Sequence, residues 1–160
     1  MKKFVIFITT IFLLFTALII YMNIKTSDGI LSKRYKENTI IQSATVTKYA
    51  PSEDRYSRSE EIGKETTDDV ELIEEMINSF SGLWLRREIN PDSWDGEYRL
   101  EIKVSNERAQ GKLWTDNIYI SFDESNRIAI SAESGGRFFV INNADYYNKM
   151  KSILDNLDWE

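Results

Sequence analysis

The amino-acid sequence predicts an α+β protein, in which an N-terminal transmembrane helix is followed by an antiparallel sheet meander packed with two amphipathic helices. Three observations support this prediction. Residues 4–22 form an almost unbroken apolar run. Two later segments, 68–80 and 147–157, repeat apolar residues at helical spacing. Several segments between residues 39 and 141 alternate apolar and polar residues, as half-buried strands do.

The apolar run reads FVIFITTIFLLFTALIIYM and directly follows Lys2 and Lys3. At about 1.5 Å per residue, a helix of this length spans about 28 Å, close to the hydrocarbon thickness of a bilayer. A buried core helix is disfavoured because the run is apolar on every face. A cleaved signal peptide would have a shorter apolar region and a small-x-small cleavage site. The residues after Ile20 read YMNIK and offer no such site, so we expect an uncleaved anchor, with cleavage as the alternative.

The charges that flank the run bear on its orientation. Lys2 and Lys3 favour a cytoplasmic N-terminus under the positive-inside rule, whereas basic residues beyond the run oppose it. A short basic tail before an apolar run is also the form of an export signal, so we expect the N-terminus inside. The expected location is the cell membrane, with a single pass and an extracytoplasmic C-terminal domain, or secretion if the run is cleaved. The opposing basic residues are Lys25, Lys33, Arg34 and Lys36.

We expect three parts along the chain: an anchor over 1–24, a polar juxtamembrane linker over 25–38, and a single α+β domain over 39–160. The chain contains no cysteine and no histidine. This composition excludes disulfides, thiolate metal sites, a lipid-modified cysteine, and Ser-His or Cys-His catalysis. We therefore expect no cofactor.

Charge restricts the partners of the soluble part. Three of the 20 basic residues and none of the 26 acidic residues precede residue 26, which leaves a formal charge of −9 on the remainder. Such a surface repels the phosphates of nucleic acids, so no nucleic-acid partner is expected. It suits a basic partner, or serves only solubility.

The domain opens with two predicted strands. Apolar and threonine residues over 39–49 predict the first strand. A polar loop follows Pro51, and a short second strand is expected over 62–66.

A helix is expected next. Asp68 can cap it, with Glu71 completing a capping box, or alternatively Thr66 can cap it with Asp69 as partner. Gly82 is its expected stop. The apolar stripe of this helix consists of Val70, Ile73, Ile77 and Phe80, with Met76 beside it.

A run of strands follows the helix. Alternation predicts strands from residue 83, over 98–104, over 118–122, over 128–132 and over 138–141. The segment DESN predicts a tight hairpin turn, and SGG predicts another turn. Short connections between consecutive strands imply an antiparallel meander.

A final helix closes the predicted domain. Asn142 or Asn143 is its expected N-cap. Its apolar stripe consists of Tyr147, Met150, Leu154 and Leu157. Two one-sided helices and a one-sided sheet can bury one another's apolar surfaces, which is why we expect the helices to cover the sheet.

The segments that carry a resemblance are SATVTKY, KETTDDVELIEEMINSF, DGEYRLEIKV, NIYISFDESNRIAIS and GGRFFVINNADYYNKMKSIL, behind a basic N-terminal anchor. This layout, over residues 39–157, resembles that of the small, uncharacterised extracytoplasmic domains of Bacillus-type Gram-positive bacteria. The resemblance implies the fold and the location. It carries over no functional residue.

Two acidic regions raise the question of a cation or catalytic site. Residues 53–75 are strongly acidic, and oxygen-bearing side chains surround Gly96. Neither region has the D-x-D-x-D-G order of a compact calcium loop, so we expect a solvated loop and helix face in the first case and a turn in the second. A glycosidase would need two carboxylates about 5–10 Å apart across a cleft, which a sequence does not specify.

Aromatic residues give the candidate interaction surface. Tyr119 points away from its neighbours Ile118 and Ile120 in a strand, and adjacent Phe138 and Phe139 point to opposite faces. Aromatic side chains on a face without helices would suit protein or glycan recognition, unless a helix or loop covers them. The candidate residues are Trp94, Trp114, Tyr119 and Phe139.

We therefore expect a membrane-tethered extracytoplasmic binding or accessory module, not an enzyme, that recognises a protein, peptide or envelope component. No catalytic or metal site is predicted. The expected partners are the membrane, through residues 4–22, and a protein or envelope component. The alternative is a carboxylate-dependent hydrolase of cell-envelope polymers.

Overall fold

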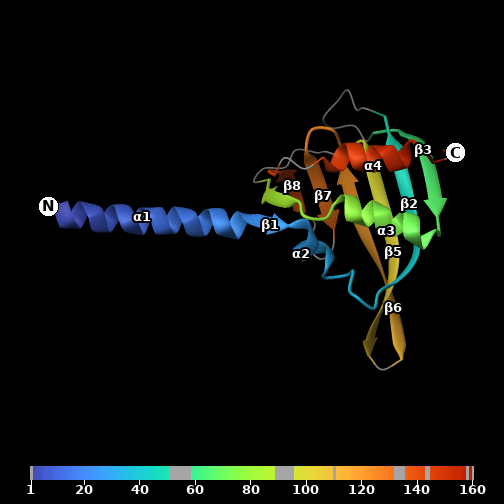
Figure 1. Cartoon of the computed structure of the whole chain (residues 1–160), viewed down its shortest axis with the longest axis horizontal. Helices are drawn as coiled ribbons and strands as arrows, with labels where there is room; N and C mark the ends of the chain where they lie inside the picture. The colour runs from blue at the N-terminus through green and yellow to red at the C-terminus, as the bar shows by residue number, and fades with distance from the viewer. Residues whose placement is uncertain are drawn as a thin grey trace.

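The computed structural model (Figure 1) confirms the α+β layout. It describes residues 2–50, 59–88, 96–109, 111–131, 136–142, 145–157 and 159. The helices are α1 (Lys2–Asn23), α2 (Ser27–Leu31), α3 (Val70–Ser79) and α4 (Tyr146–Leu154). The strands are β1 (Ile24–Thr26), β2 (Ile40–Tyr49), β3 (Glu61–Thr67), β4 (Trp84–Arg87), β5 (Tyr98–Ala109), β6 (Lys112–Phe122), β7 (Arg127–Ser131) and β8 (Gly136–Val140).

The predicted N-terminal helix is present as α1, which projects away from the rest of the molecule (Figure 1). Its three threonines each donate a hydroxyl hydrogen bond to the carbonyl four residues earlier, at 2.8–2.9 Å. The hydroxyl groups are thereby satisfied inside the helix, as an apolar environment requires. α1 is long and apolar enough to cross a membrane, and a signal sequence would have the same character.

All the strands described belong to one antiparallel sheet, in the order β1-β4-β8-β7-β6-β5-β2-β3. The strands β5, β6, β7 and β8 are neighbours in sequence and in space, which confirms the predicted meander. By contrast, β1 pairs with β4, which is distant in sequence, with Ile24 opposite Arg86 and Thr26 opposite Trp84. The β1 edge of the sheet thus joins segments that local patterns alone do not bring together.

The helices α3 and α4 lie side by side across one face of the sheet (Figure 1). Alternation in the strands directs the apolar side chains toward them, and burying each large side chain contributes about 1.5–3 kcal/mol. This arrangement confirms the predicted helix-covered sheet. The centre of the core consists of Leu100, Ile102, Ile118, Ile120, Phe122, Ile128, Ile73, Met76, Phe80, Met150 and Leu154.

The N-cap of α3 differs from the first expectation. Asp69, not Asp68, precedes the helix in an extended conformation, and its carboxylate accepts hydrogen bonds from the backbone N–H groups of Glu71 and Leu72, at 3.0 and 3.3 Å. Thr67 in turn accepts from the backbone N–H of Asp69. Strand β3 runs to Thr67, one residue beyond the predicted end, which moves the start of the helix along by one position.

The expected cap of α4 also differs. Asp145 precedes the helix, and its side chain makes no capping hydrogen bond. Asn142 instead accepts from the backbone N–H of Trp84 and donates to the carbonyl of Gly82, both at 2.8 Å. Asn143 lies outside the described residues. Because α4 starts at Tyr146, Tyr146 and Ile153 join Met150 and Leu154 on its buried face, and the predicted stripe members Tyr147 and Leu157 are half-buried.

Residues 24–31, expected largely as linker, contribute β1 and α2 and belong to the packed structure. Ser27 is fully buried, and it donates its backbone N–H to the carbonyl of Leu83 while its hydroxyl accepts from the N–H of Leu83. The carboxylate of Asp28 accepts from the hydroxyl of Ser81 and the N–H of Gly82, at 2.9 and 3.0 Å. Three residues of strand are too few to give a recognisable alternation, so the sequence pattern alone does not reveal β1.

The hairpin of β5 and β6 is longer than predicted. Its ladder continues to the pair Ala109 and Lys112, and Gly111 turns the chain at φ +73°. Figure 1 shows this tip extending beyond the neighbouring strands. No helix covers the tip, so its residues are largely polar, and the apolar alternation that identifies the rest of each strand fades there.

Replacing Asp69 by alanine is expected to lower the free energy of unfolding of the domain by about 1 kcal/mol, because two N-terminal N–H groups of α3 lose their acceptor. The measurement is denaturant unfolding of the full chain in detergent micelles, followed by tryptophan fluorescence. Asp68→Ala is the matched control and is expected to change the free energy by less than about 0.5 kcal/mol. A larger loss in Asp68→Ala than in Asp69→Ala would contradict the observed cap.

Alkaline pH is expected to destabilise the domain through two buried tyrosines, Tyr98 and Tyr146, and the half-buried Tyr147. Burial, followed by Glu97, raises the pKa of Tyr98 to about 12. Burial also raises the pKa of Tyr146 and of Tyr147, and Tyr147 donates its hydroxyl to Glu97 at 2.7 Å. The folded state keeps protons that the unfolded chain releases near pH 10, so stability is full below about pH 10 and falls as pH rises through the folded values.

The measurement is thermal unfolding of the full chain at a series of alkaline pH values. The melting temperature is expected to fall above about pH 10. Tyr147→Phe should show a shallower fall, because one of the protons responsible is removed. An equally steep fall in this variant would contradict the assignment.

Candidate functional site

The face of the sheet opposite α3 and α4, here called the open face, bears the candidate site. The strand register places Arg99 of β5, Ser121 of β6, Ala129 of β7 and Arg137 of β8 in one row across four neighbouring strands. Tyr119 and Ser131 form part of the next row. Side chains in such rows are direct neighbours, since adjacent strands are about 4.8 Å apart.

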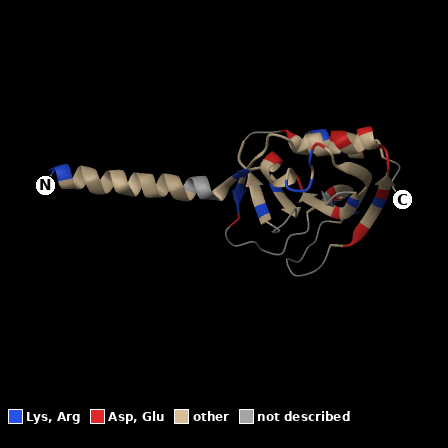
Figure 2. Cartoon of the chain, turned by 90° about the horizontal axis from the view of Figure 1, so that it is seen from below, with Lys and Arg blue, Asp and Glu red and all other residues tan. Residues whose placement is uncertain are grey.

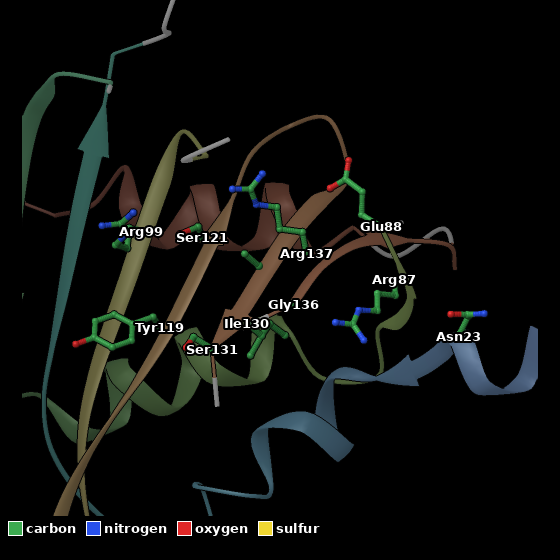
Figure 3. A pocket seen from close by; sticks show the side chains of 11 residues that line it. Asn23, Arg87, Glu88, Arg99, Tyr119, Ser121, Ile130, Ser131, Gly136 and Arg137 are labelled. Atoms are coloured by element: carbon green, nitrogen blue, oxygen red, sulfur yellow. The ribbon is translucent and has the colours of Figure 1, made fainter. Parts of the chain in front are cut away.

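A hollow of about 720 Å³ opens on this face. We call it the arginine hollow. Figure 3 shows Arg99 and Tyr119 on one flank and Arg87, Glu88 and Asn23 on the other, with Arg137 between them. The remaining lining residues described are Ser121, Ala129, Ile130, Ser131 and Gly136.

Small side chains create the floor of the arginine hollow. Ser121, Ala129 and Ser131 leave space between the longer side chains that rise around them. Gly136 is required in β8 for a different reason: a Cβ atom at this position would lie 2.6 Å from the ring of Phe138. The close approach of this ring, which is buried on the helix-covered face, therefore excludes any larger residue at position 136.

The hollow is cationic. Its described lining includes the guanidinium groups of Arg87, Arg99 and Arg137 and one carboxylate, that of Glu88. Glu88 already lies 3.9 Å from the guanidinium of Arg127. Within a chain of formal charge −6, this concentration of positive charge is local. Figure 2 shows the basic residues near the junction of α1 with the domain and many acidic residues along the helices and the outer strands.

Arg137 has an unused donor. Its Nη1 atom is buried and has no hydrogen-bond partner in the structure. A buried N–H group without an acceptor costs about 1–3 kcal/mol. Arg99 is held differently, with its guanidinium 5.4 Å from the ring centre of Tyr49. Guanidinium groups present paired N–H donors that match carboxylate and phosphate oxygens, so this arrangement is suited to an anionic group.

The structure places the four sequence-predicted aromatic residues in different surroundings. Tyr119 is 36% exposed and lines the arginine hollow, where its hydroxyl accepts from the side-chain amide of Asn117. Phe139 lies on the same open face, beneath Arg86 and Arg127.

The other two aromatic residues do not join this surface. Trp114 is 55% exposed near the tip of the β5–β6 hairpin, and alternation puts it on the side of Ile118, away from Tyr119. Trp94 lies outside the described residues. The structure therefore brings Tyr119 and Phe139 onto one face and does not bring Trp114 to it.

Sequence reasoning missed the arginines. Alternation in β5 does direct Arg99 to the polar face, and that signal is present in the sequence. The row with Arg137, however, depends on the pairings of β6 with β7 and of β7 with β8. For the acidic regions, the described residues contain no group of three or more acidic side chains arranged to hold a metal ion.

Comparisons with known proteins found no relative of this chain. No protein family matches it, and no similar protein was found among curated sequences or solved structures.

Replacing Arg137 by methionine is expected to raise the free energy of unfolding by about 1 kcal/mol, because the buried unpaired N–H group is removed while the apolar stem is kept. The measurement is denaturant unfolding of the full chain in micelles. Arg127→Met is the matched control and should lower the free energy slightly, since this arginine contacts Glu88 and the ring of Phe139. A clear loss of stability in Arg137→Met would show that this guanidinium serves the fold.

Proposed function

We propose that this chain is a membrane-tethered extracytoplasmic binding module, and that its arginine hollow recognises an acidic group on a protein, peptide or envelope component. The observation that carries the proposal is the buried, unpartnered Nη1 atom of Arg137 in a hollow with two further arginines. A fold that keeps such a costly donor gains if a ligand supplies the acceptor.

α1 and its junction with the sheet support the proposed tether. β1 begins at Ile24, immediately after α1, and residues 24–31 are paired or packed in the domain. The residues that directly follow α1 are thus part of the folded domain rather than a separate linker, which favours a retained anchor. Together with the basic start at Lys2 and Lys3, this supports a single-pass protein with its domain outside the cytoplasm. The resemblance to extracytoplasmic domains of Bacillus-type bacteria points to the same location.

The spacing of the arginines favours an extended ligand. Arg99 and Arg137 stand in the same row three strands apart, which corresponds to about 14 Å. Tyr119 adds an aromatic surface beside this row. A ligand with more than one acidic group along its length would contact both arginines, whereas a single small anion would contact one.

The hydrolase alternative has less support. Carboxylate-dependent hydrolysis of a glycan needs an acid and a second carboxylate across the substrate. The described lining of the hollow provides one carboxylate, Glu88, which is adjacent to Arg127. The geometry therefore favours binding over cleavage.

The test uses the full chain in nanodiscs of zwitterionic lipid, titrated with tetraglutamate and with tripolyphosphate as anionic probes in a calorimeter. At least one probe is expected to bind, and the double variant Arg99→Gln with Arg137→Gln should bind it at least about tenfold more weakly. The matched control, Lys149→Gln with Lys151→Gln, removes the same charge from α4 and should bind as the wild type does.

Equal weakening of binding in both double variants would show that the effect comes from net charge, which would contradict the proposed site. Failure of both probes to bind the wild-type chain would contradict it as well. A photo-crosslinking residue at Ser131, used in intact membranes, then identifies the natural partner. Cleavage of envelope polymer by the wild-type chain would favour the hydrolase instead.

A further inference from the structure

A second hollow, of about 440 Å³, lies where α1 meets the sheet. We call it the junction hollow. Ile19 and Asn23 of α1 form one wall, and Arg86 and Arg87 of β4 form the other, with Ile24, Glu88 and Phe139 completing the lining. The hollow therefore combines apolar Ile19 of α1 with two arginines of the domain, and its one carboxylate, that of Glu88, lies 3.9 Å from the guanidinium of Arg127.

The level of this hollow relative to a bilayer follows from the positions of its residues along the chain. Asn23 is the last residue of α1, and Ile19 lies one helical turn earlier, about 6 Å toward the apolar run. β1 follows α1 without an intervening residue, and Ile24 pairs with Arg86. With α1 in a bilayer, Ile19 reaches the hydrocarbon and Arg86 stands at the level of the lipid headgroups.

The arginine side chains of the junction hollow are arranged to bind a phosphate group. The guanidinium of Arg86 lies 5.7 Å from the ring centre of Phe139, which restricts its orientation. Among the described residues, no carboxylate forms an ion pair with Arg86 or Arg87. Ile19 is 46% exposed, although it is apolar and lies directly beside these cations. A ligand with an acidic head and an apolar tail matches both walls.

We propose that the junction hollow binds one phospholipid of the leaflet in which α1 ends, with its phosphate at the guanidinium groups of Arg86 and Arg87 and its acyl part against Ile19. This site is distinct from the acidic-ligand site, although Asn23, Arg87 and Glu88 border both hollows. It requires α1 to be inserted in a membrane, as proposed above. Binding of the lipid would hold the domain at one angle to the bilayer and leave the arginine hollow accessible beside it.

The experiment incorporates the full chain into nanodiscs of phosphatidylcholine with phosphatidylglycerol and measures retained lipid by native mass spectrometry after release. The wild type is expected to retain one phospholipid, and Arg86→Gln should retain about tenfold less. Lys103→Gln is the matched control: it removes the same charge from β5, away from α1, and should retain lipid as the wild type does. Arg86→Lys should restore retention only partly, because lysine lacks the paired donors.

Three outcomes would overturn the site. Retention in Arg86→Gln equal to that of Lys103→Gln would remove the assigned phosphate contact. Displacement of the lipid by millimolar inorganic phosphate would show that the hollow takes free phosphate rather than a bilayer lipid. Failure of the wild-type chain to enter nanodiscs would refute membrane insertion and this site together. Titration of the same soluble probes into the chain held in detergent micelles would still test the arginine hollow separately.

Discussion

The pairing of β1 with β4 is the interaction on which the arrangement of the molecule depends. It joins the end of α1 to the edge of the sheet without a linker, and the buried Ser27 and the carboxylate of Asp28 secure the same junction. Asn142 ties the turn before β4 to the segment before α4. The position of both hollows relative to α1 follows from these few bonds. Without these bonds, a flexible segment would connect α1 to the domain, and the arginines would have no defined position relative to α1.

The two faces of the sheet have opposite characters because of one alternation. Leu100, Ile120 and Ile128 are buried under α3 and α4. Because side chains alternate along a strand, the residues next to them point to the opposite, open face. Register then decides which outward side chains meet, and it brings Arg99 and Arg137 into one row. The acidic charge is carried largely by the helices and outer strands, so a chain that is acidic overall presents a basic site (Figure 2). Net charge alone therefore does not describe the charge of this face.

Most of the fold could be predicted from the sequence, because α1, α3 and the strands β5 to β8 each have a strong local pattern. The rest depends on contacts between distant segments. β1 has three residues and becomes a strand only because β4 is beside it. Asp69 rather than Asp68 caps α3 because β3 continues to Thr67. For the candidate site, alternation placed Tyr119 and Phe139 on the outward face, but the grouping of arginines requires the strand order, which no short motif encodes.

The direct continuation of α1 into β1 also has a mechanical consequence. β1 continues along the axis of α1 (Figure 1), and the hydrogen bonds to β4 run across the strands. A pull on a ligand held by the open face would therefore load these bonds in shear, all at once, rather than opening them one by one. The load would pass from the sheet into α1 through this pairing. With α1 in a bilayer, the junction would resist tension as a tie does.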